Sequence, residues 1–243
     1  MAEPRPLSTA PPPAPHGLSA AGRIRLATFL SPAFPVGAFS YSHGLEWALD
    51  CGTVKDSATL SAWIADLLRR GSFWCDAVLL KCTYEAAAIG NNATLLEIGV
   101  LAEALAPSRE RHLETMAMGE AFLAAVRAAW PGGILNRLFV ATSGRLAYPV
   151  AVGAVAADHA IPLTDALPVY LNAVAANLIS VAVRLVPLGQ SDGQRALADL
   201  EPAVRRAADQ AIATPFEAIG SAAPMVDLTS MQHETQYTRL FRS

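Results

Sequence analysis

Apolar residues in this sequence recur at intervals of three and four positions over most of its length. The clearest stripe lies within residues 57–71 and consists of Leu60, Trp63, Ile64, Leu67 and Leu68. This spacing places the five side chains on one face of an α-helix. Strands require alternation of apolar and polar positions, and no alternating run of β-branched residues extends beyond a few positions. The sequence therefore predicts an all-α fold.

The amount of apolar sequence indicates one large core. The chain has 243 residues, of which 53% are hydrophobic and 16% are charged, so it can bury a sizeable interior. Its alanine-rich stretches fit helices better than strands. Residues 131–133, Pro-Gly-Gly, are the strongest break in the middle of the chain, but apolar helical patterns continue on both sides. We therefore expect a single bundle of roughly eight to ten helices.

The two ends of the chain differ from this middle part. Residues 1–21 contain six prolines and almost no large apolar side chain, so we predict a disordered arm there. Residues 22–224 carry the helical patterns and form the predicted domain. Residues 225–243 are polar with a few isolated apolar positions, too few to offset the ordering of their backbone. We predict that they form a flexible, partner-binding tail that is mobile, or borrowed by a neighbouring chain, until a partner orders it.

Composition and motifs exclude several classes of protein. The net charge is −3 and the only lysines are Lys55 and Lys81, so no basic field favours nucleic acid. A phosphate-binding loop needs glycines followed by a lysine, and neither lysine lies in that pattern. The dinucleotide pattern G-x-G-x-x-G is also absent. We expect no nucleotide hydrolysis, no cofactor and no nucleic-acid partner.

Cysteine usage and hydropathy indicate a cytoplasmic protein. The three cysteines are an odd number in a chain too long to need staples, which argues against a disulfide framework. The beginning of the chain lacks the continuous apolar region of an export signal. The uncharged run 166–183 approaches the length of a membrane span, but Pro168 and polar residues interrupt it. We expect a buried helix of a soluble protein and no membrane partner.

A few side chains permit an alternative, a helical metal carrier or enzyme. His43 and Glu46 lie one turn apart on a predicted helix, and Cys51, Cys75 and Cys82 offer thiols. No second ligand pair follows at short spacing, so we interpret Cys75 and Cys82 as small buried hydrophobic residues. We interpret His43 as a structural or interfacial histidine. No catalytic residue is predicted.

Two segments look like surfaces for other proteins. Residues 31–41, SPAFPVGAFSY, combine turn residues with large apolar side chains, and such a loop must pack against something. We predict that Phe34 and Phe39 are buried against the following helix, and that Tyr41 and His43 lie near a protein interface. The second segment is the end of the chain, where Arg-Leu-Phe-Arg combines aromatic and arginine anchors.

Four sequence elements identify a resemblance. Residues 30–49, LSPAFPVGAFSYSHGLEWAL, closely resemble the N-terminal signature of the UreF family of urease accessory proteins. SRERHLETMAMGEAF at 108–122, VRLVPLGQSDGQRAL at 183–197 and HETQYTRLFRS at 233–243 are similar to later elements of that family, in the same order. One departure is Ala38, where many members carry a second glycine.

The resemblance implies a cytoplasmic, all-helical, non-enzymatic scaffold that forms a homodimer. Members of the family bind a UreD/UreH-type accessory protein and the GTPase UreG, and the assembly docks on apo-urease to insert nickel. In that picture the GTP chemistry and the nickel carrier site belong to the partners. The absence of a phosphate-binding loop in this sequence agrees with that division.

We therefore expect partner contacts in both segments. In the tail, aromatic and leucine side chains should fill pockets on the UreD/UreH-type protein, and arginines should add charge-assisted bonds around them. The expected partner-binding residues are Phe34, Tyr41, His43, Glu46, His233, Glu234, Gln236, Tyr237, Arg239, Leu240, Phe241 and Arg242.

Overall fold

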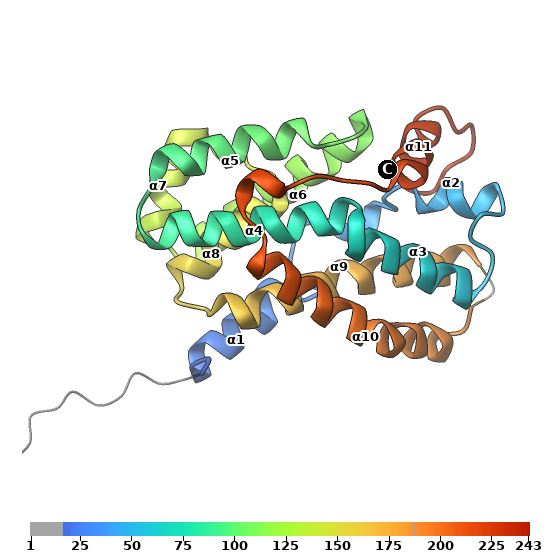
Figure 1. The fold of residues 1–243 in the computed structure, drawn as a ribbon, viewed down its shortest axis with the longest axis horizontal. Coiled ribbons are helices and arrows are strands. Elements are labelled where there is room, and N and C mark those ends of the chain that lie inside the picture. Colours follow the sequence, from blue (N-terminus) through green and yellow to red (C-terminus); the bar gives the residue numbers. More distant parts are fainter. Residues whose placement is uncertain (1–16, 187) are drawn as a thin grey trace, which may run out of the picture.

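A computed structural model describes residues 17–186 and 188–243 of the chain (Figure 1). Within these ranges it contains eleven α-helices, two short 3-10 helices and no strand, which confirms the predicted class. The α-helices are α1 (Ala20–Phe29), α2 (Leu45–Asp50), α3 (Ser57–Arg70), α4 (Ser72–Ala88), α5 (Asn92–Ala104), α6 (Arg109–Ala129), α7 (Gly133–Thr142), α8 (Tyr148–Asp158), α9 (Leu163–Leu185), α10 (Gln190–Ala213) and α11 (Pro224–His233). The 3-10 helices are Ala38–Ser40 and Phe216–Ala218.

Most of the predicted disordered arm, residues 1–16, lies outside the described residues. The end of the predicted arm differs from expectation, because α1 already begins at Ala20. The Ser19 side chain accepts a hydrogen bond from the backbone N–H of Gly22 and caps this helix. A serine directly before the first turn of a helix is a common N-cap.

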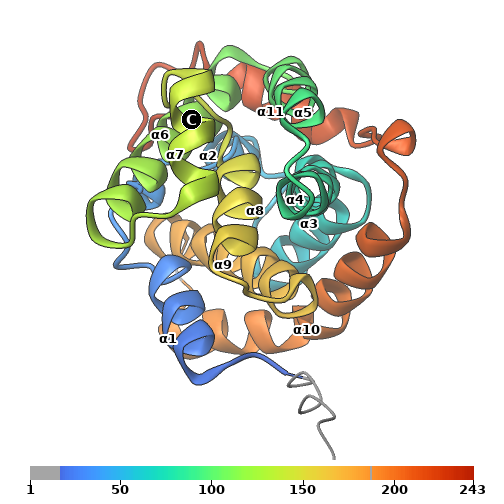
Figure 2. The same ribbon diagram turned by 90° about the vertical axis from the view of Figure 1, so that its left-hand side faces the viewer.

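Helices α4 and α8 form the centre of the bundle (Figure 2). Nearly all of α8 is buried, and a Cβ at Gly153 would lie 2.5 Å from the Leu80 carbonyl oxygen of α4. The two helices therefore approach more closely than any larger residue at position 153 would allow. Helix α6, which precedes the Pro-Gly-Gly break at 131–133 in the sequence, packs against α8, which follows it. Both halves of the chain thus share one core, as predicted.

Two helices illustrate how the sequence pattern becomes burial. The predicted stripe of α3 faces inward, and all five of its apolar residues are buried. The Asp56 side chain accepts the backbone N–H of Thr59 at its start. Helix α9 contains the uncharged run and is long and apolar enough to cross a membrane. However, 50% of its most apolar 18-residue window is buried inside the protein. It contacts α10, α4 and α2.

The aromatic loop, which we define as residues 31–44, meets only part of its prediction. Phe34 is 8% exposed, and its ring packs against those of Phe122 at 5.3 Å and Phe29 at 5.9 Å. These rings belong to α6 and α1 rather than to the following helix. The prediction for Phe39 is wrong, because its side chain is 68% exposed.

The backbone of the loop explains why Phe39 points outward. Gly37 adopts a left-handed conformation with φ of 72° before the turn Ala38–Ser40. Two side chains of α9 then hold this turn by its carbonyl groups: Asn177 donates to Ala38 at 3.1 Å and Arg184 donates to Phe39 at 3.0 Å. Because α9 holds the carbonyl side of the turn, the Phe39 ring lies on the solvent side.

The end of the chain also differs from the prediction of a flexible tail. The segment expected to be the tail contains α11, whose residues Val226, Thr229, Ser230 and His233 are buried. The chain then returns toward α2, where Phe241 is 5% exposed and Ser243 is 1% exposed. The backbone is ordered here because buried polar groups of the bundle supply its hydrogen bonds, which apolar content alone could not indicate.

Candidate functional site

The two segments predicted as separate surfaces lie side by side in the structure. We define the C-terminal segment as residues 234–243. Its Arg242 N–H donates to the Ser40 carbonyl oxygen at 2.8 Å, and the Ser42 N–H donates to the Ser243 carbonyl oxygen at 2.7 Å. Figure 1 shows the end of the chain beside α2 and α11. The aromatic loop and the C-terminal segment together form what we call the composite surface.

Arginine–aromatic contacts also join the two segments to each other and the C-terminal segment to α9. The Arg184 guanidinium lies 4.5 Å from the ring centroid of Phe241, and that of Arg242 lies 5.8 Å from the ring centroid of Tyr41. Contacts of this kind fix aromatic rings by electrostatic attraction as well as by packing. The same Arg184 holds the carbonyl oxygen of Phe39 in the aromatic loop.

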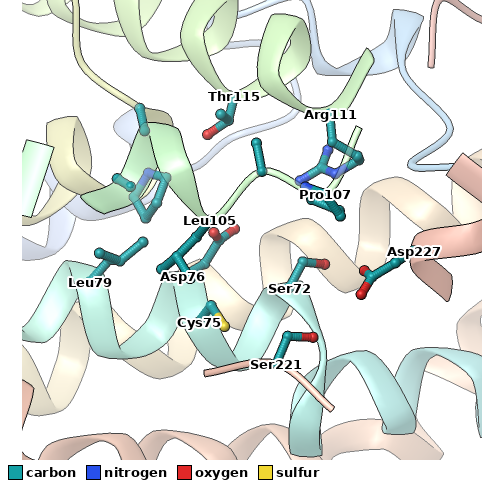
Figure 3. Close-up of a pocket in the computed structure, with 14 residues that line it drawn as sticks. Ser72, Cys75, Asp76, Leu79, Leu105, Pro107, Arg111, Thr115, Ser221 and Asp227 are labelled. Carbon is teal, nitrogen blue, oxygen red and sulfur yellow. The ribbon is translucent and has the colours of Figure 1, made fainter. Parts of the chain in front are cut away.

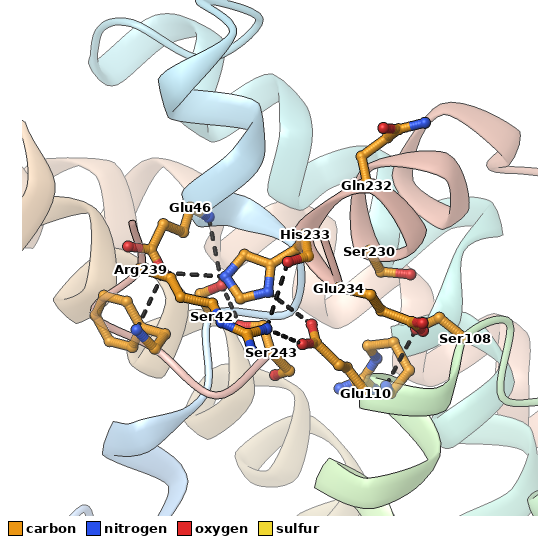
Figure 4. A network of polar contacts seen from close by, with 12 residues as sticks. Ser42, Glu46, Ser108, Glu110, Ser230, Gln232, His233, Glu234, Arg239 and Ser243 are labelled. Atoms are coloured by element: carbon orange, nitrogen blue, oxygen red, sulfur yellow. Dashed lines mark hydrogen bonds and ion pairs between the residues drawn. The ribbon is translucent and has the colours of Figure 1, made fainter. Parts of the chain in front are cut away.

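Glu46, in the first turn of α2, receives the C-terminal segment (Figure 4). Its Oε1 accepts the Leu240 N–H at 2.7 Å and its Oε2 accepts the Phe241 N–H at 3.0 Å. The carboxylate is buried, with the residue 6% exposed. A buried carboxylate that accepts two backbone N–H groups is well satisfied and holds the donors in place.

His233, the last residue of α11, bridges two carboxylates below this contact (Figure 4). Its ring is fully buried. Nε2 lies 3.0 Å from Glu46 Oε2, and Nδ1 lies 2.6 Å from Glu110 Oε2 at the start of α6. Arg239 of the C-terminal segment donates to the other oxygen of Glu110. One histidine and two carboxylates thus connect α2, α6, α11 and the C-terminal segment.

Glu234 anchors the beginning of the C-terminal segment to the start of α6. Its Oε1 accepts the Arg109 N–H at 2.8 Å. Ser108 caps the same helix by accepting the Arg111 N–H. Unpaired N–H groups and the helix dipole make a helix N-terminus a favourable place for a carboxylate.

A second polar cluster lies next to the first and centres on Glu114 of α6. Its Oε2 accepts the Ser243 hydroxyl at 2.6 Å, and its Oε1 lies 3.4 Å from His43 Nδ1. Glu114 also forms an ion pair with Arg111. His43 Nε2 contacts the Ser72 hydroxyl at 2.5 Å. These contacts place the last residue of the C-terminal segment on charged groups of the bundle interior.

The ionisation of this second cluster follows from burial and from Arg111. Burial, and then the nearby Arg111 charge, lower the pKa of His43 to about 4, and Glu114 offsets them only in part. His43 is therefore neutral at pH 7. Burial alone would raise the pKa of Glu114, but Arg111 and then His43 outweigh it and hold the pKa far below its ordinary value. Glu114 therefore remains a carboxylate.

A cavity of about 470 Å³ lies beside this cluster. Its lining includes Asp76, Arg111 and Tyr170, and a smaller pocket shares Asp76 and Arg111 with it (Figure 3). The Tyr170 hydroxyl donates to Asp76 at 3.0 Å. Burial raises the pKa of Asp76 to about 6, with Arg111 acting in the opposite direction. Of the charged groups around the cavity, Arg111 pairs with Glu114, and Asp76 is bonded to Tyr170.

The side chains proposed for a metal carrier are separated by the fold. Over residues 17–186 and 188–243, no group of three or more His, Cys, Asp or Glu side chains is placed to hold a metal ion. His43 and Glu46 were expected on one helix face, but His43 precedes α2 with φ of 60° and turns to Glu114 and Ser72. Cys75 and Cys82 are buried, as expected. Burial raises the pKa of Cys75 to about 12, which favours the thiol over the thiolate that binds metal.

The twelve predicted residues divide into buried and exposed groups. The buried group is Phe34, Tyr41, His43, Glu46, His233 and Phe241. Phe241, which was expected to fill a pocket of a partner, is packed within this chain, where its ring lies beside Arg184. Glu234 and Gln236 are partly exposed. Four residues are exposed: Tyr237, Arg239, Leu240 and Arg242.

Sequence reasoning missed the residues of α6 that receive the C-terminal segment. Glu110, Arg111 and Glu114 are buried charges in the stretch SRERHLETMAMGEAF that carries part of the family resemblance. Glu110 and Glu114 are four positions apart, so they share one helix face. This spacing, next to apolar positions of the same helix, was the sequence signal that could have indicated buried carboxylates.

The structure gives a direct prediction for acid stability. Because the pKa of His43 falls from 6.5 to about 4 on folding, the unfolded chain takes up a proton below about pH 6.5 that the folded chain does not. His43→Gln removes this titration. When the pH falls from about 7 to about 4.5, the unfolding free energy of the wild type should decrease by roughly 2–3 kcal/mol more than that of the variant.

The measurement is urea unfolding of both proteins at the two pH values. Asp76 titrates in an overlapping range with the opposite sign, since its pKa is raised, but it is present in both proteins and cancels in the comparison. Equal losses of stability in the two proteins would show that His43 does not titrate as its environment indicates.

The fold and the site define an all-helical protein whose buried charges dock its C-terminal segment. Comparison with known proteins places it in a family. The UreF family profile matches residues 54–201. Urease accessory protein UreF of Rhodopseudomonas palustris strain HaA2 is 52% identical over 223 residues, covering 92% of this chain and 94% of that protein. The protein of the same name from Bradyrhizobium diazoefficiens is 50% identical over 224 residues, covering 92% and 93%.

A third relative extends the comparison to another genus. Urease accessory protein UreF of Methylorubrum populi is 48% identical over 220 residues, covering 90% of this chain and 98% of that protein. The match therefore extends over almost the whole chain and not only over its central helices. The chain belongs to the UreF family of urease accessory proteins.

Proposed function

We propose that this protein is a non-catalytic, cytoplasmic scaffold of urease maturation. It forms a homodimer, binds a UreD/UreH-type accessory protein and the GTPase UreG, and supports nickel insertion into apo-urease through that complex. Membership of the UreF family supports the role in urease maturation. The metal-carrier alternative finds no support in the described residues, where the candidate ligands are dispersed and the thiol of Cys75 stays protonated.

The composite surface is the feature that carries the proposal for partner binding. The docked C-terminal segment presents Tyr237, which is fully exposed, and Leu240, which is 76% exposed. Arg239 and Arg242 lie beside them and are also exposed. Exposed apolar side chains surrounded by arginines are typical of protein interfaces, where the apolar groups form the centre and the charges form the rim.

The neighbouring face of α11 extends this surface. Met225, Leu228 and Met231 are exposed, and they are spaced by three positions, so they follow one side of the helix. The opposite side of α11 packs against the bundle. A helix that is held by its own domain on one face and exposes apolar side chains on the other is suited to contact a second protein there.

The test uses a single exposed side chain and a matched control. We expect Leu240→Asn to weaken binding of the UreD/UreH-type protein by about tenfold or more, because an apolar interface residue is lost while the backbone bond to Glu46 remains. Val100→Asn is the control, since Val100 on α5 is 71% exposed, close to the 76% of Leu240. Affinities are measured by titration calorimetry of the purified proteins. If both variants bind as the wild type does, the surface is not the interface.

A further inference from the structure

The contacts of His233 require a particular protonation state. Its Nε2 lies 3.0 Å from Glu46 and its Nδ1 lies 2.6 Å from Glu110. A neutral imidazole has one N–H and one lone pair, so it donates to one carboxylate and turns a lone pair toward the other. Both contacts are hydrogen bonds only when the ring carries two protons. The geometry therefore favours the imidazolium form.

The charges that face the ring come from three elements. Glu46 belongs to α2, Glu110 belongs to α6, and Arg239 of the C-terminal segment donates to Glu110. Two carboxylates and one guanidinium leave one negative charge, which the imidazolium balances. The next charged groups pair elsewhere. On α6, Arg111 forms an ion pair with Glu114, and at the end of α11 the Glu234 carboxylate accepts the Arg109 N–H.

The same two carboxylates hold the C-terminal segment. Glu46 accepts the N–H groups of Leu240 and Phe241, and Glu110 accepts Arg239. If His233 loses a proton, one hydrogen bond is lost and two buried carboxylates face a single cation. The oxygens that bind the segment are then held less firmly. Docking of the segment and protonation of His233 thus stabilise each other.

We propose that Glu46, His233 and Glu110 form a proton-dependent docking cluster for the C-terminal segment. Glu46 and His233 are positioning residues: they fix the segment so that Leu240 and its neighbouring arginines meet a partner in one geometry. This consequence rests on the proposed function. Because the doubly protonated ring favours docking, acid favours the docked segment and a rise in pH favours its release.

Amide hydrogen exchange in the full chain tests the cluster directly. The Leu240 and Phe241 amides report on docking because they donate to Glu46. Their protection factors, corrected for base-catalysed intrinsic exchange, are compared at an acidic value of about pH 5.5 and a basic value of about pH 8.5. In the wild type we expect protection to fall by about tenfold or more over this range.

Three variants separate positioning from general structural damage. His233→Gln should show low protection at both pH values, and Glu46→Gln should lower protection at the acidic value toward that of the released segment. His112→Gln is the matched control, because His112 is another histidine paired with a carboxylate, but its side chain is partly exposed and its partner is Glu103 of α5. This control should keep the pH dependence of the wild type.

The outcomes distinguish this inference from the proposed function. The cluster is overturned if wild-type protection is independent of pH, or if His233→Gln keeps the pH dependence. Binding of the UreD/UreH-type protein is measured in parallel by calorimetry. If protection follows the expected pattern while partner binding is the same for the wild type and His233→Gln, the docking cluster stands and the proposed partner surface is wrong.

Discussion

Deleting residues 239–243 is expected to abolish partner recruitment and urease activation while the helical bundle remains folded. The deletion removes the exposed Leu240 and Arg242 of the composite surface. It also removes the backbone donors to Glu46 and the Ser243 hydroxyl that bonds to Glu114. The helices of the core stay, since their contacts lie within α3, α4, α6, α8, α9 and α10. We expect pull-down of the UreD/UreH-type protein to fall to background.

Circular dichroism and urease activity in cells that express the other maturation proteins are the measurements. The helical signal should stay close to that of the full chain, with a lower unfolding midpoint because buried carboxylates lose their partners. A truncated protein that is unfolded would show that the segment is part of the core. Normal urease activation by a folded truncation would mean that this end of the chain does not recognise partners.

Phe34→Ala is expected to lower the unfolding free energy by about 3–5 kcal/mol. The Phe34 ring is 8% exposed and contacts Phe29, Phe122 and Trp130. These neighbours belong to α1, α6 and the end of α6, so they cannot close the space left by the ring without moving helices. The loss therefore combines the transfer term with an unfilled cavity.

Phe39→Ala is the matched control for this prediction. It removes the same side chain from the same loop, but Phe39 is 68% exposed, so its stability should change by no more than about 0.5 kcal/mol. Urea unfolding of the two variants beside the wild type is the measurement. Equal effects of both substitutions would contradict the assignment of Phe34 as the residue that anchors the loop.

The helical architecture could be predicted because its signals are local. The inward stripe of α3 follows from spacing alone, and Asp56 and Ser108 act as the N-caps that their residue types favour. Burial of Cys75 and Cys82 also followed from residue type. Such features depend on neighbours within one or two turns, and these are visible in the sequence.

The candidate site could be predicted only in its parts. Most of the residues that form it were named from the aromatic loop and the end of the chain. The sequence did not indicate that the two segments form one surface. The bonds that join them link residues far apart in the chain, Ser42 to Ser243 and Glu46 to Phe241. The outward position of Phe39 similarly depends on Asn177 and Arg184 of a distant helix.

The sequence by itself determined the all-helical class, the family and the two segments that other proteins are proposed to contact. Only the tertiary structure decided that these segments form one surface and that the last residues are packed. The physical reason is that Glu46, Glu110 and Glu114 are charged side chains that a composition argument places in solvent. The fold buries them, and once buried they need hydrogen-bond donors, which His233, Arg239 and the backbone of the C-terminal segment provide.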